Sequence, residues 1–586
     1  MTDRIVPSRV PRRSATVWFA VRAWGLRTRH FFGPSSRLRR FGRREDAEAF
    51  PATLARSISS LYAGDGLSPT ERLWQLGKVE NLRRAIRALD GVVVPAGGEF
   101  SFWRQVGPPW RIRGFVVGRE LREGCLIPNV GGGLCQLSNA LYDCALQAGA
   151  EIVERHRHTQ VVPGSLAELN RDATVFWNYV DLRFRFPWAW RISARLEADR
   201  LVVALQAATE TRNDGGTPGL SGEGRGGVEN CATCGVEQCL RHVGAGPAAA
   251  EKTAVIVDEF WPEFDAWLTE RPSAELVVPL RFSRWRRSAY AWTEEGWNSV
   301  RDAPGLALWR AHRSRRLVAQ GAARQRALLD FDRTVGQALA SRASWQASRA
   351  IVAQNFLPHL HASGWLGGRA VTVLLSRWPI RCLEERLDAA SRRHPRSPTL
   401  ADFRADPALA EAEWAALEAA ETLVTCHARL AEIWPHKTTL LPWNLPNRGT
   451  NGMKSGAGEC VVFPASGVGR KGAYELRTAL REIPIPLRIL GREQLEDDPQ
   501  FWGDLPRAGE GCDWLDGARA VVLPAWIEHR PRRLLEAIAA GVPVIATDAC
   551  GLHGWPATAV VKIVPAGDSA ALADALRAVV TGEVIA

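Results

Sequence analysis

Short apolar runs alternate with helical stretches through the second half of this chain, and this alternation limits its fold more than any other feature. Residues 254–257 and 371–375 are such runs, and long segments rich in alanine, leucine and arginine lie between and after them. A second series begins at 460–464, beyond a loop rich in proline, asparagine and glycine at 441–458. Strands that alternate with helices form parallel, wound sheets. We therefore expect two successive α/β domains with ligands at the carboxyl ends of their strands.

The first half of the chain has a different texture and predicts a separate domain. Helical spacing near residue 75 and strand-like segments at 183–186 and 201–205 indicate one compact α+β domain. A chain of 586 residues is also too long for a single core. We therefore expect five parts: a basic arm at 1–50, the α+β domain at 51–208, a glycine-rich linker at 209–250, and α/β domains at 251–445 and 446–586.

Positive charge is concentrated at the start of the chain. Residues 1–44 hold twelve arginines and one acidic residue, and the remainder holds 63 basic against 62 acidic residues. A neutral body argues against a protein that binds nucleic acid over its whole surface. The apolar run at 15–21 is too short to span a bilayer. We expect a cytoplasmic protein whose arm makes a peripheral contact with an anionic membrane surface, and a solvated tail is the alternative.

The loop after residues 460–464 carries a cluster of glycines and two cations. Arg470 and Lys471 come directly before Gly472, and a helix is predicted at 473–480. Glycine-rich backbone and a helix start both offer N–H groups to an anion. The whole chain has only six lysines, so chance is a poorer explanation for Lys471. The loop therefore predicts a diphosphate site, and an ordinary strand–helix turn with surface charges is the alternative.

Two glutamates eight positions apart belong to the next strand–helix turn. Glu528 follows the apolar run at 518–524, and Glu536 falls inside a helix that starts near Pro531. Acidic residues in such places accept the hydroxyl groups of a ribose in other nucleotide sites. The alternative is a pair of solvated glutamates on an amphipathic helix.

Residues 458–580 resemble the C-terminal half of retaining, family-4-like GT-B glycosyltransferases. The resemblance rests on the Lys-Gly loop, the Glu-x7-Glu element and the segment Ala-Gly-Val-Pro-Val-Ile-Ala-Thr at 540–547. It implies two Rossmann-like domains, a nucleotide-sugar donor, and stabilisation of the departing diphosphate by protein cations without a metal. Ser466 departs from the family, which usually has an arginine about five residues before the lysine.

The same resemblance implies roles for individual residues. Arg470, Lys471 and Gly472 would bind the diphosphate, Glu536 the ribose, and Glu528 would lie beside the donor sugar. Residues 251–445 would form the acceptor-side domain, where His359 belongs to a polar cluster and is a candidate for the acceptor side of the cleft. A structural or surface histidine is the alternative. The catalytic candidates are thus Glu528, Lys471 and His359.

Residues 91–185 resemble a second family, VanW, which takes its name from vancomycin-resistance clusters. The segments that carry this resemblance are Pro-Ala-Gly-Gly-Glu-Phe-Ser-Phe at 95–102, Asn-Val-Gly-Gly-Gly-Leu-Cys-Gln-Leu-Ser-Asn-Ala-Leu-Tyr at 129–142, Glu-Arg-His-Arg-His at 154–158 and Arg-Asp-Ala-Thr-Val at 171–175. The family supplies no established chemistry to transfer to these residues.

Cys135 follows three glycines and opens a predicted helix, a position that favours the thiolate. His156 or His158 could act as its base, and Asp172 could orient that histidine. This arrangement predicts a Cys–His site. A buried cysteine among glycines that packing requires is the alternative.

A short cysteine-rich segment lies in the linker. Cys231, Cys234, Cys239 and His242 give the spacing C-x2-C-x4-C-x2-H. Three thiolates and an imidazole can close a tetrahedral zinc site. An iron–sulfur cluster and free thiols are the alternatives.

Together these features favour an enzyme that moves a sugar from a nucleotide sugar to an unidentified acceptor, which the arm suggests lies near the cell envelope. The alternative is an envelope-binding, resistance-associated VanW-like protein whose transferase half is a degenerate scaffold. The serine at position 466 favours that alternative. Intact Glu528, Glu536 and Lys471 favour the enzyme.

Overall fold

The computed structural model describes residues 25, 40–42, 48–62, 69–122, 125–157, 166, 169–177, 180–209, 252–270, 274–317, 321–446, 458–491, 498, 500–503, 505–509, 513–552 and 561–581. No helix in these ranges is both long enough and apolar enough to cross a lipid bilayer.

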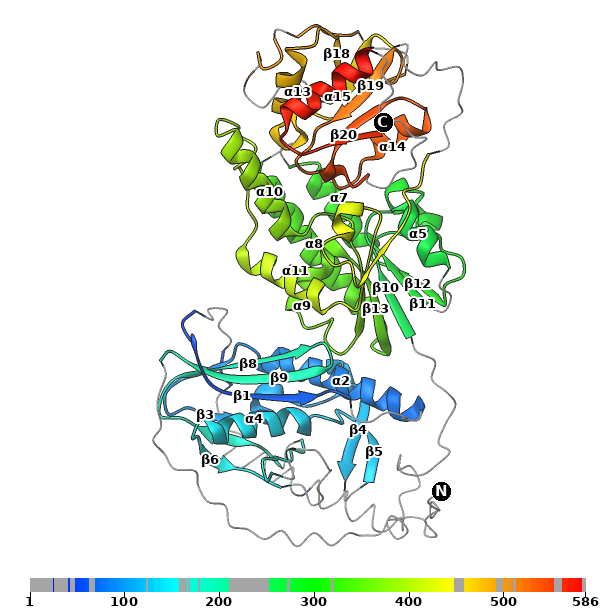
Figure 1. The fold of residues 1–586 in the computed structure, drawn as a ribbon. Coiled ribbons are helices and arrows are strands. Elements are labelled where there is room, and N and C mark those ends of the chain that lie inside the picture. The colour runs from blue at the N-terminus through cyan, green and yellow to red at the C-terminus, as the bar shows by residue number, and fades with distance from the viewer. Residues whose placement is uncertain are drawn as a thin grey trace. The chain divides into compact units, whose positions relative to one another are not determined.

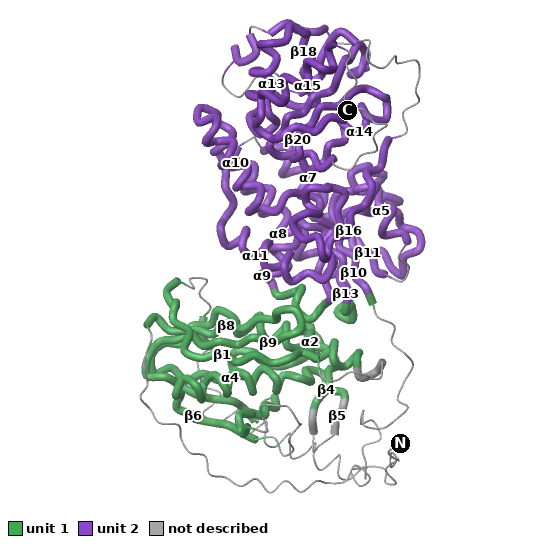
Figure 2. The backbone as a smooth tube through the Cα atoms, in the orientation of Figure 1, with its two compact units in different colours: residues 1–252, 344–348, 364–369 green, residues 253–343, 349–363, 370–586 purple. Residues whose placement is uncertain are grey.

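Two compact units make up the chain (Figure 2). Unit 1 comprises Met1–Lys252, Ser344–Ser348 and Gly364–Arg369. Unit 2 comprises Thr253–Ala343, Arg349–Ser363 and Ala370–Ala586.

Unit 1 is built on antiparallel strands, as Figure 1 shows in blue and cyan. The main sheet has the order β1-β9-β8-β2, a smaller sheet has the order β3-β7-β6, and β4 and β5 form a separate two-stranded hairpin. Its strands are β1 (Ala52–Ser60), β2 (Val93–Val94), β3 (Glu99–Ser101), β4 (Val117–Arg122), β5 (Cys125–Val130), β6 (Glu151–Glu154), β7 (Arg183–Arg185), β8 (Trp190–Glu197) and β9 (Arg200–Ala207). Its helices are α2 (Pro69–Leu89), α3 (Phe102–Val106) and α4 (Cys135–Gln147).

Aromatic side chains fill the core of unit 1. Phe100, Phe184, Phe186 and Trp190 are fully buried, and the rings of Phe184 and Trp190 stack with centroids 5.2 Å apart. Burying one such side chain contributes about 1.5–3 kcal/mol. Along β8, buried residues alternate with more exposed ones, the pattern of a strand with only one face in the core.

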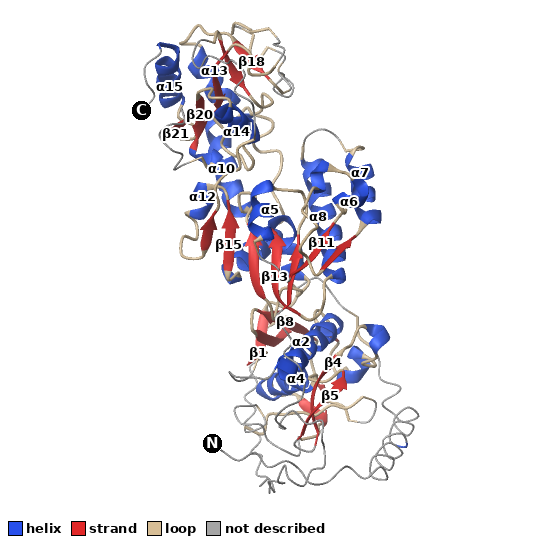
Figure 3. Ribbon diagram, turned by 90° about the vertical axis from the view of Figure 1, so that its right-hand side faces the viewer, coloured by secondary structure: helices blue, strands red, loops and turns tan. Residues whose placement is uncertain are grey.

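Unit 2 contains two parallel sheets (Figure 3). The first has the order β12-β11-β10-β13-β14-β15-β16. Its strands are β10 (Lys252–Ile256), β11 (Ala274–Val278), β12 (Ser299–Asp302), β13 (Ala347–Ala353), β14 (Ala370–Leu374), β15 (Thr422–Thr425) and β16 (Thr438–Leu440). Its helices are α5 (Pro262–Thr269), α6 (Phe282–Trp285), α7 (Pro304–Ser314), α8 (Ala322–Arg342), α9 (Leu357–Ala362), α10 (Ile380–Arg393), α11 (Pro407–Ala419) and α12 (Ala428–Ala431). The direction in which successive strands are added reverses between β10 and β13, and ligands of open α/β sheets bind beside such a point.

The second sheet has the order β18-β17-β19-β20-β21. Its strands are β17 (Cys460–Phe463), β18 (Leu487–Ile489), β19 (Ala518–Leu523), β20 (Val544–Thr547) and β21 (Val561–Val564), with helices α13 (Ala473–Leu480), α14 (Arg532–Ala539) and α15 (Ser569–Thr581). The residues of β17 and β20 are all buried, as expected of strands covered on both faces. The fold class expected from the sequence is thus confirmed: an antiparallel α+β region precedes two parallel, Rossmann-like sheets.

Candidate functional site

Lys471 owes its position to a tight strand–helix turn in the second sheet. A 3-10 turn at Gly469–Lys471 follows β17, and Gly472 then adopts φ +81° before α13 begins. A Cβ atom on Gly472 would lie 1.9 Å from the carbonyl oxygen of Pro524. Only glycine fits there, because the two loops approach so closely. The turn is also tied to the neighbouring loop, since the carbonyl oxygen of Arg470 accepts a hydrogen bond from Trp526 N at 3.0 Å.

Lys471 and Glu528 form a partly buried ion pair between these two loops. The Lys471 Nζ lies 2.8 Å from Glu528 Oε2. The other oxygen, Oε1, accepts hydrogen bonds from the backbone N–H groups of His529 and Arg530, both at 2.9 Å. Burial alone would raise the pKa of Glu528, but the Lys471 charge and these hydrogen bonds outweigh it and hold the pKa at about 2. Glu528 is therefore a fixed anion beside a fixed cation.

Two neutral histidines, His427 and His529, flank Glu528, and no motif in the sequence indicated either of them. His427 Nδ1 accepts a hydrogen bond from Leu430 N at 3.3 Å, so its Nε2 carries the proton and donates to Ala549 O at 3.0 Å. His529 Nδ1 accepts from Trp378 N at 3.1 Å. Burial lowers the pKa of His427 to about 4 and that of His529 to about 3.

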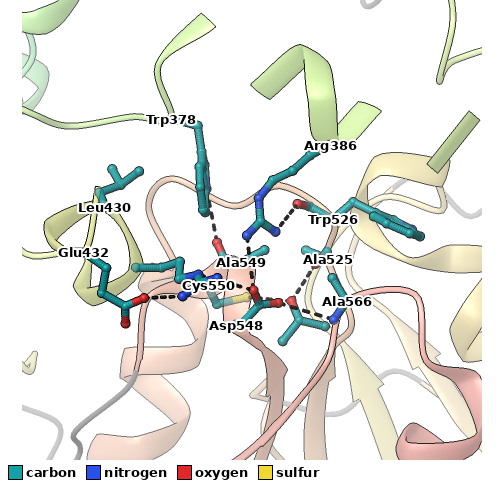
Figure 4. Close-up of polar contacts among 12 residues, drawn as sticks. Trp378, Arg386, Leu430, Glu432, Ala525, Trp526, Asp548, Ala549, Cys550 and Ala566 are labelled. Atoms are coloured by element: carbon teal, nitrogen blue, oxygen red, sulfur yellow. Dashed lines mark hydrogen bonds and ion pairs between the residues drawn. The ribbon is translucent and has the colours of Figure 1, made fainter. Parts of the chain in front are cut away.

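Polar contacts also join α10 to the end of β20 (Figure 4). Arg386 donates to Asp548 Oδ2 at 3.1 Å, and its guanidinium lies 4.0 Å from the centre of the Trp378 ring. The Trp378 indole N–H points to Ala549 O at 3.4 Å. These contacts hold the two sheets of unit 2 together beside the Glu528 loop.

A cavity of about 580 Å³ begins at the carboxyl ends of β10, β13 and β14. Asp258, Asn355 and Arg377 follow these three strands and line it, and His529 and Arg530 line it from the second sheet. The cavity thus lies where the strand order reverses and adjoins the loop that carries Glu528. Its volume is within the range of about 300–1,000 Å³ that is typical of small-molecule sites.

Charged side chains form a network along one wall of this cavity. Arg310 contacts both oxygens of Asp258, at 2.5 and 2.9 Å, and also donates to the Tyr290 hydroxyl at 2.7 Å. Asn355 bridges Asp258 and Asp332 at 2.8 and 3.1 Å. Burial raises the pKa of Asp332 to about 6, although the Arg377 charge opposes this shift. One feature of the sequence indicated this wall of the cavity: a polar residue follows each of the apolar runs that form β10, β13 and β14.

The remaining residues predicted for the transferase lie at different distances from this centre. Glu536 is half-buried in the second turn of α14, which begins after the Glu528 loop, and Arg470 is half-buried beside Lys471. His359 is buried on α9, does not line the cavity, and its Nε2 has no hydrogen-bond partner. Asn355, four positions before His359, lines the cavity instead. The roles suggested for Glu536, Arg470 and His359 stay predictions.

In unit 1, Cys135 is the first residue of α4, as predicted, and its Sγ lies 3.8 Å from Val175 O. His156 is half-exposed and contacts Glu154 at 3.3 Å. The buried Asp172 accepts a hydrogen bond from Arg155 Nη2 at 2.8 Å. His156 does not line the cavity next to Cys135. The Cys–His site therefore stays a prediction.

The other predicted site residues lie outside the described residues: His158, and the four of the cysteine-rich segment, Cys231, Cys234, Cys239 and His242. Among residues that are described, no three His, Cys, Asp or Glu side chains gather closely enough to hold a metal ion. The zinc hypothesis thus stays a prediction.

Two family models match the chain, one in each unit. The model described as "VanW like protein" matches residues 77–206, and the model described as "Glycosyl transferases group 1" matches residues 473–581. This chain carries a VanW-like domain and a group 1 glycosyltransferase domain. Its two parallel sheets give the transferase half the GT-B fold.

Similar proteins cover only part of this chain. The chain is 38% identical over 105 residues to "Uncharacterized protein YoaR" of Bacillus subtilis (strain 168), which is 18% of this chain and 34% of that protein. It is 32% identical over 118 residues to "Vancomycin B-type resistance protein VanW" of Enterococcus faecalis (strain ATCC 700802 / V583), which is 20% of this chain and 43% of that protein. The chain thus spans less than half the length of either relative.

Solved structures align with just over half of this chain. A sucrose-phosphate synthase from Thermosynechococcus elongatus is 17% identical with a TM-score of 0.36, covering 57% of this chain and 90% of that one. A structure described as "Trehalose-6-phosphate from E. coli bound with UDP-2-fluoro glucose" is 13% identical with a TM-score of 0.34, covering 57% of this chain and 93% of that one.

Proposed function

We propose that unit 2 transfers a sugar, with retention at its anomeric carbon, from a nucleotide sugar to an acceptor bound in the 580 Å³ cavity. One observation carries this proposal. The Lys471–Glu528 pair lies at the carboxyl ends of β17 and β19, and the loop that holds Glu528 continues into His529 and Arg530, which line that cavity. A cation for a diphosphate and an anion for sugar hydroxyls are therefore adjacent to a space for a second substrate.

The chemistry assigned to these groups is electrostatic. As the bond between sugar and diphosphate breaks, the diphosphate leaves with the bonding electrons and gains negative charge. An acceptor hydroxyl oxygen forms the new bond to the anomeric carbon on the same face, and its proton passes to the departing diphosphate. Lys471 and the N–H groups at the start of α13 stabilise that charge. Glu528 accepts hydrogen bonds from donor-sugar hydroxyls, and Glu536 accepts them from the ribose. Arg470 is the neighbouring cation and compensates for Ser466, where the family has arginine.

Donor binding can be tested by calorimetry with UDP, GDP, ADP and dTDP and their glucose conjugates. Wild-type protein should bind one of these nucleotides, and Glu536→Ala should weaken that binding about tenfold, the loss of one charge-assisted hydrogen bond of about 1.5 kcal/mol. Lys471→Ala should abolish it. Lys252→Ala is the matched control, since Lys252 opens β10 at the opposite end of its strand from the site and pairs with Gln346. Absence of binding to every nucleotide would refute the proposal.

A second candidate function is an envelope-binding protein with an inactive transferase scaffold. The serine at position 466 favours it, because a cation of the family's diphosphate site is missing. The same titrations decide between the two. A nucleotide that binds wild type and the Lys471→Ala variant equally would favour the scaffold.

A further inference from the structure

Unit 1 has a cavity of its own, of about 530 Å³, beside the triglycine loop at 131–133. Its volume is again within the range of about 300–1,000 Å³ typical of small-molecule sites. Three tryptophans line it, Trp103, Trp110 and Trp177. We propose that this cavity is a saccharide-binding site, distinct from the transferase site of unit 2.

The tryptophans provide fixed aromatic surface. The Trp103 indole N–H donates to Val180 O at 2.9 Å, which fixes the ring. Trp177 packs edge-on against it, with centroids 5.4 Å apart and ring planes at 86°. Trp110 lies at the rim with 56% of its surface exposed. Aromatic faces are electron-rich, so they attract the weakly positive C–H groups on the face of a sugar ring.

Polar groups in the lining suit hydroxyls, and the charges suit a neutral ligand. Asn129 donates to Glu120 at 2.5 Å across the β4–β5 hairpin, so an amide and a carboxylate stand together in the wall. Adjacent hydroxyls of a sugar ring bind such paired planar groups. The lining has one acidic residue, Glu120, and one basic residue, Arg111. This balance disfavours a quaternary ammonium ion, which aromatic cages otherwise bind, and it disfavours a phosphate.

The glycine loop keeps one wall bare and rigid. A Cβ atom on Gly131 would lie 2.7 Å from Pro109 Cβ, and one on Gly133 would lie 2.0 Å from Lys78 Cγ. From α2, Asn81 donates to Gly132 O at 3.0 Å and holds the loop in place. Glycines allow a ligand to approach the backbone closely. The wall is thus formed before a ligand arrives, which lowers the entropy cost of binding.

Cys135 lines the cavity, so a bound ligand should shield its thiol from reagents in solution. The test uses the full chain and measures how fast iodoacetamide alkylates Cys135, with mass spectrometry of the digested protein to identify the modified peptide. The probes are maltotriose, cellotriose and tri-N-acetylchitotriose. At about four times its dissociation constant, a bound trisaccharide should slow the reaction about fivefold. Cys382, a partly exposed cysteine of unit 2, is the internal control and should react at an unchanged rate.

Two variants locate the site. Trp110→Ala should abolish the protection of Cys135. Ile112→Ala should retain it, because Ile112 is 91% exposed two residues further on and does not line the cavity. The proposal is overturned if no trisaccharide protects Cys135, or if Trp110→Ala leaves protection intact. Protection by choline or by inorganic phosphate in place of the saccharides would also overturn it, in favour of a cation or anion site.

Discussion

At the scale of single residues, the proposed donor site contains a buried carboxylate, Glu528, paired with the ammonium group of Lys471. Lys471→Ala should lower the free energy of unfolding of unit 2 by about 3–5 kcal/mol, because Glu528 would then be buried without its cation. Urea unfolding followed by tryptophan fluorescence measures this loss. The double variant Lys471→Ala, Glu528→Gln should recover most of it. Equal stability of the single and double variants would show that the ion pair has no such role.

The same carboxylate links stability to acid pH. Its pKa is about 2, below its ordinary value of 4.5, so deprotonated Glu528 stabilises the folded state above pH 4.5. That contribution disappears as the pH falls toward 2. The two buried histidines affect stability at higher pH than Glu528 does. Because their pKa values are lowered in the folded state, protons bind to these histidines in the unfolded chain first as the pH falls.

The buried histidines therefore predict a loss of stability between pH 6.5 and 4. With a pKa of about 4 in the folded state against 6.5 unfolded, His427 should cost about 2 kcal/mol of stability at pH 5 relative to pH 7.5. His427→Asn can still cap α12 and should reduce the dependence by that amount. Urea unfolding at the two pH values measures it. An unchanged pH dependence in the variant would contradict the assignment of a neutral His427.

At the scale of elements, α2 supports the triglycine loop that forms one wall of the unit 1 cavity. Gly133→Ala should destabilise unit 1 by about 2–5 kcal/mol, because it adds a clash with Lys78 to the strain of φ +98°. Gly97→Ala is the matched control, since Gly97 has φ +70° but no atom within 4 Å of an added Cβ. The Gly97→Ala substitution should lower the free energy of unfolding by only about 1 kcal/mol. Thermal unfolding compares the two, and equal effects would mean that the loop is not clamped.

At the scale of the whole molecule, the residues proposed for the donor site all belong to unit 2. Every described partner of Lys471 and Glu528 belongs to residues 427–530. A fragment of residues 251–586 should therefore bind the nucleotide with a dissociation constant within about twofold of the full chain, since distant and unshared sites act independently. Isothermal titration of both proteins measures this. A loss of binding in a folded fragment would show that unit 1 contributes to the donor site.

The sequence by itself determined the local structure and the residue chemistry of both halves. Helix 473–480 and strand 460–463 were predicted almost to the residue, because glycine marks their boundary and apolar runs mark buried strands. The side chains of the proposed donor site were chosen from local chemistry, because a lysine beside a glycine-rich turn can bind an anion and a glutamate after a strand can accept hydrogen bonds from hydroxyls, and their roles stay predictions.

Only the tertiary structure decided which of these groups meet. Glu528 pairs with Lys471 across 57 positions, and His529 meets Trp378 across 151. Such pairings follow from how parallel strands are ordered in a sheet, which local periodicity does not encode. In unit 1, where the strands are antiparallel, tertiary packing likewise pairs Asp172 with Arg155 and places Trp103 against Trp177 beside a cavity. Spacing along the chain identifies the groups that carry chemistry, and packing alone selects their partners.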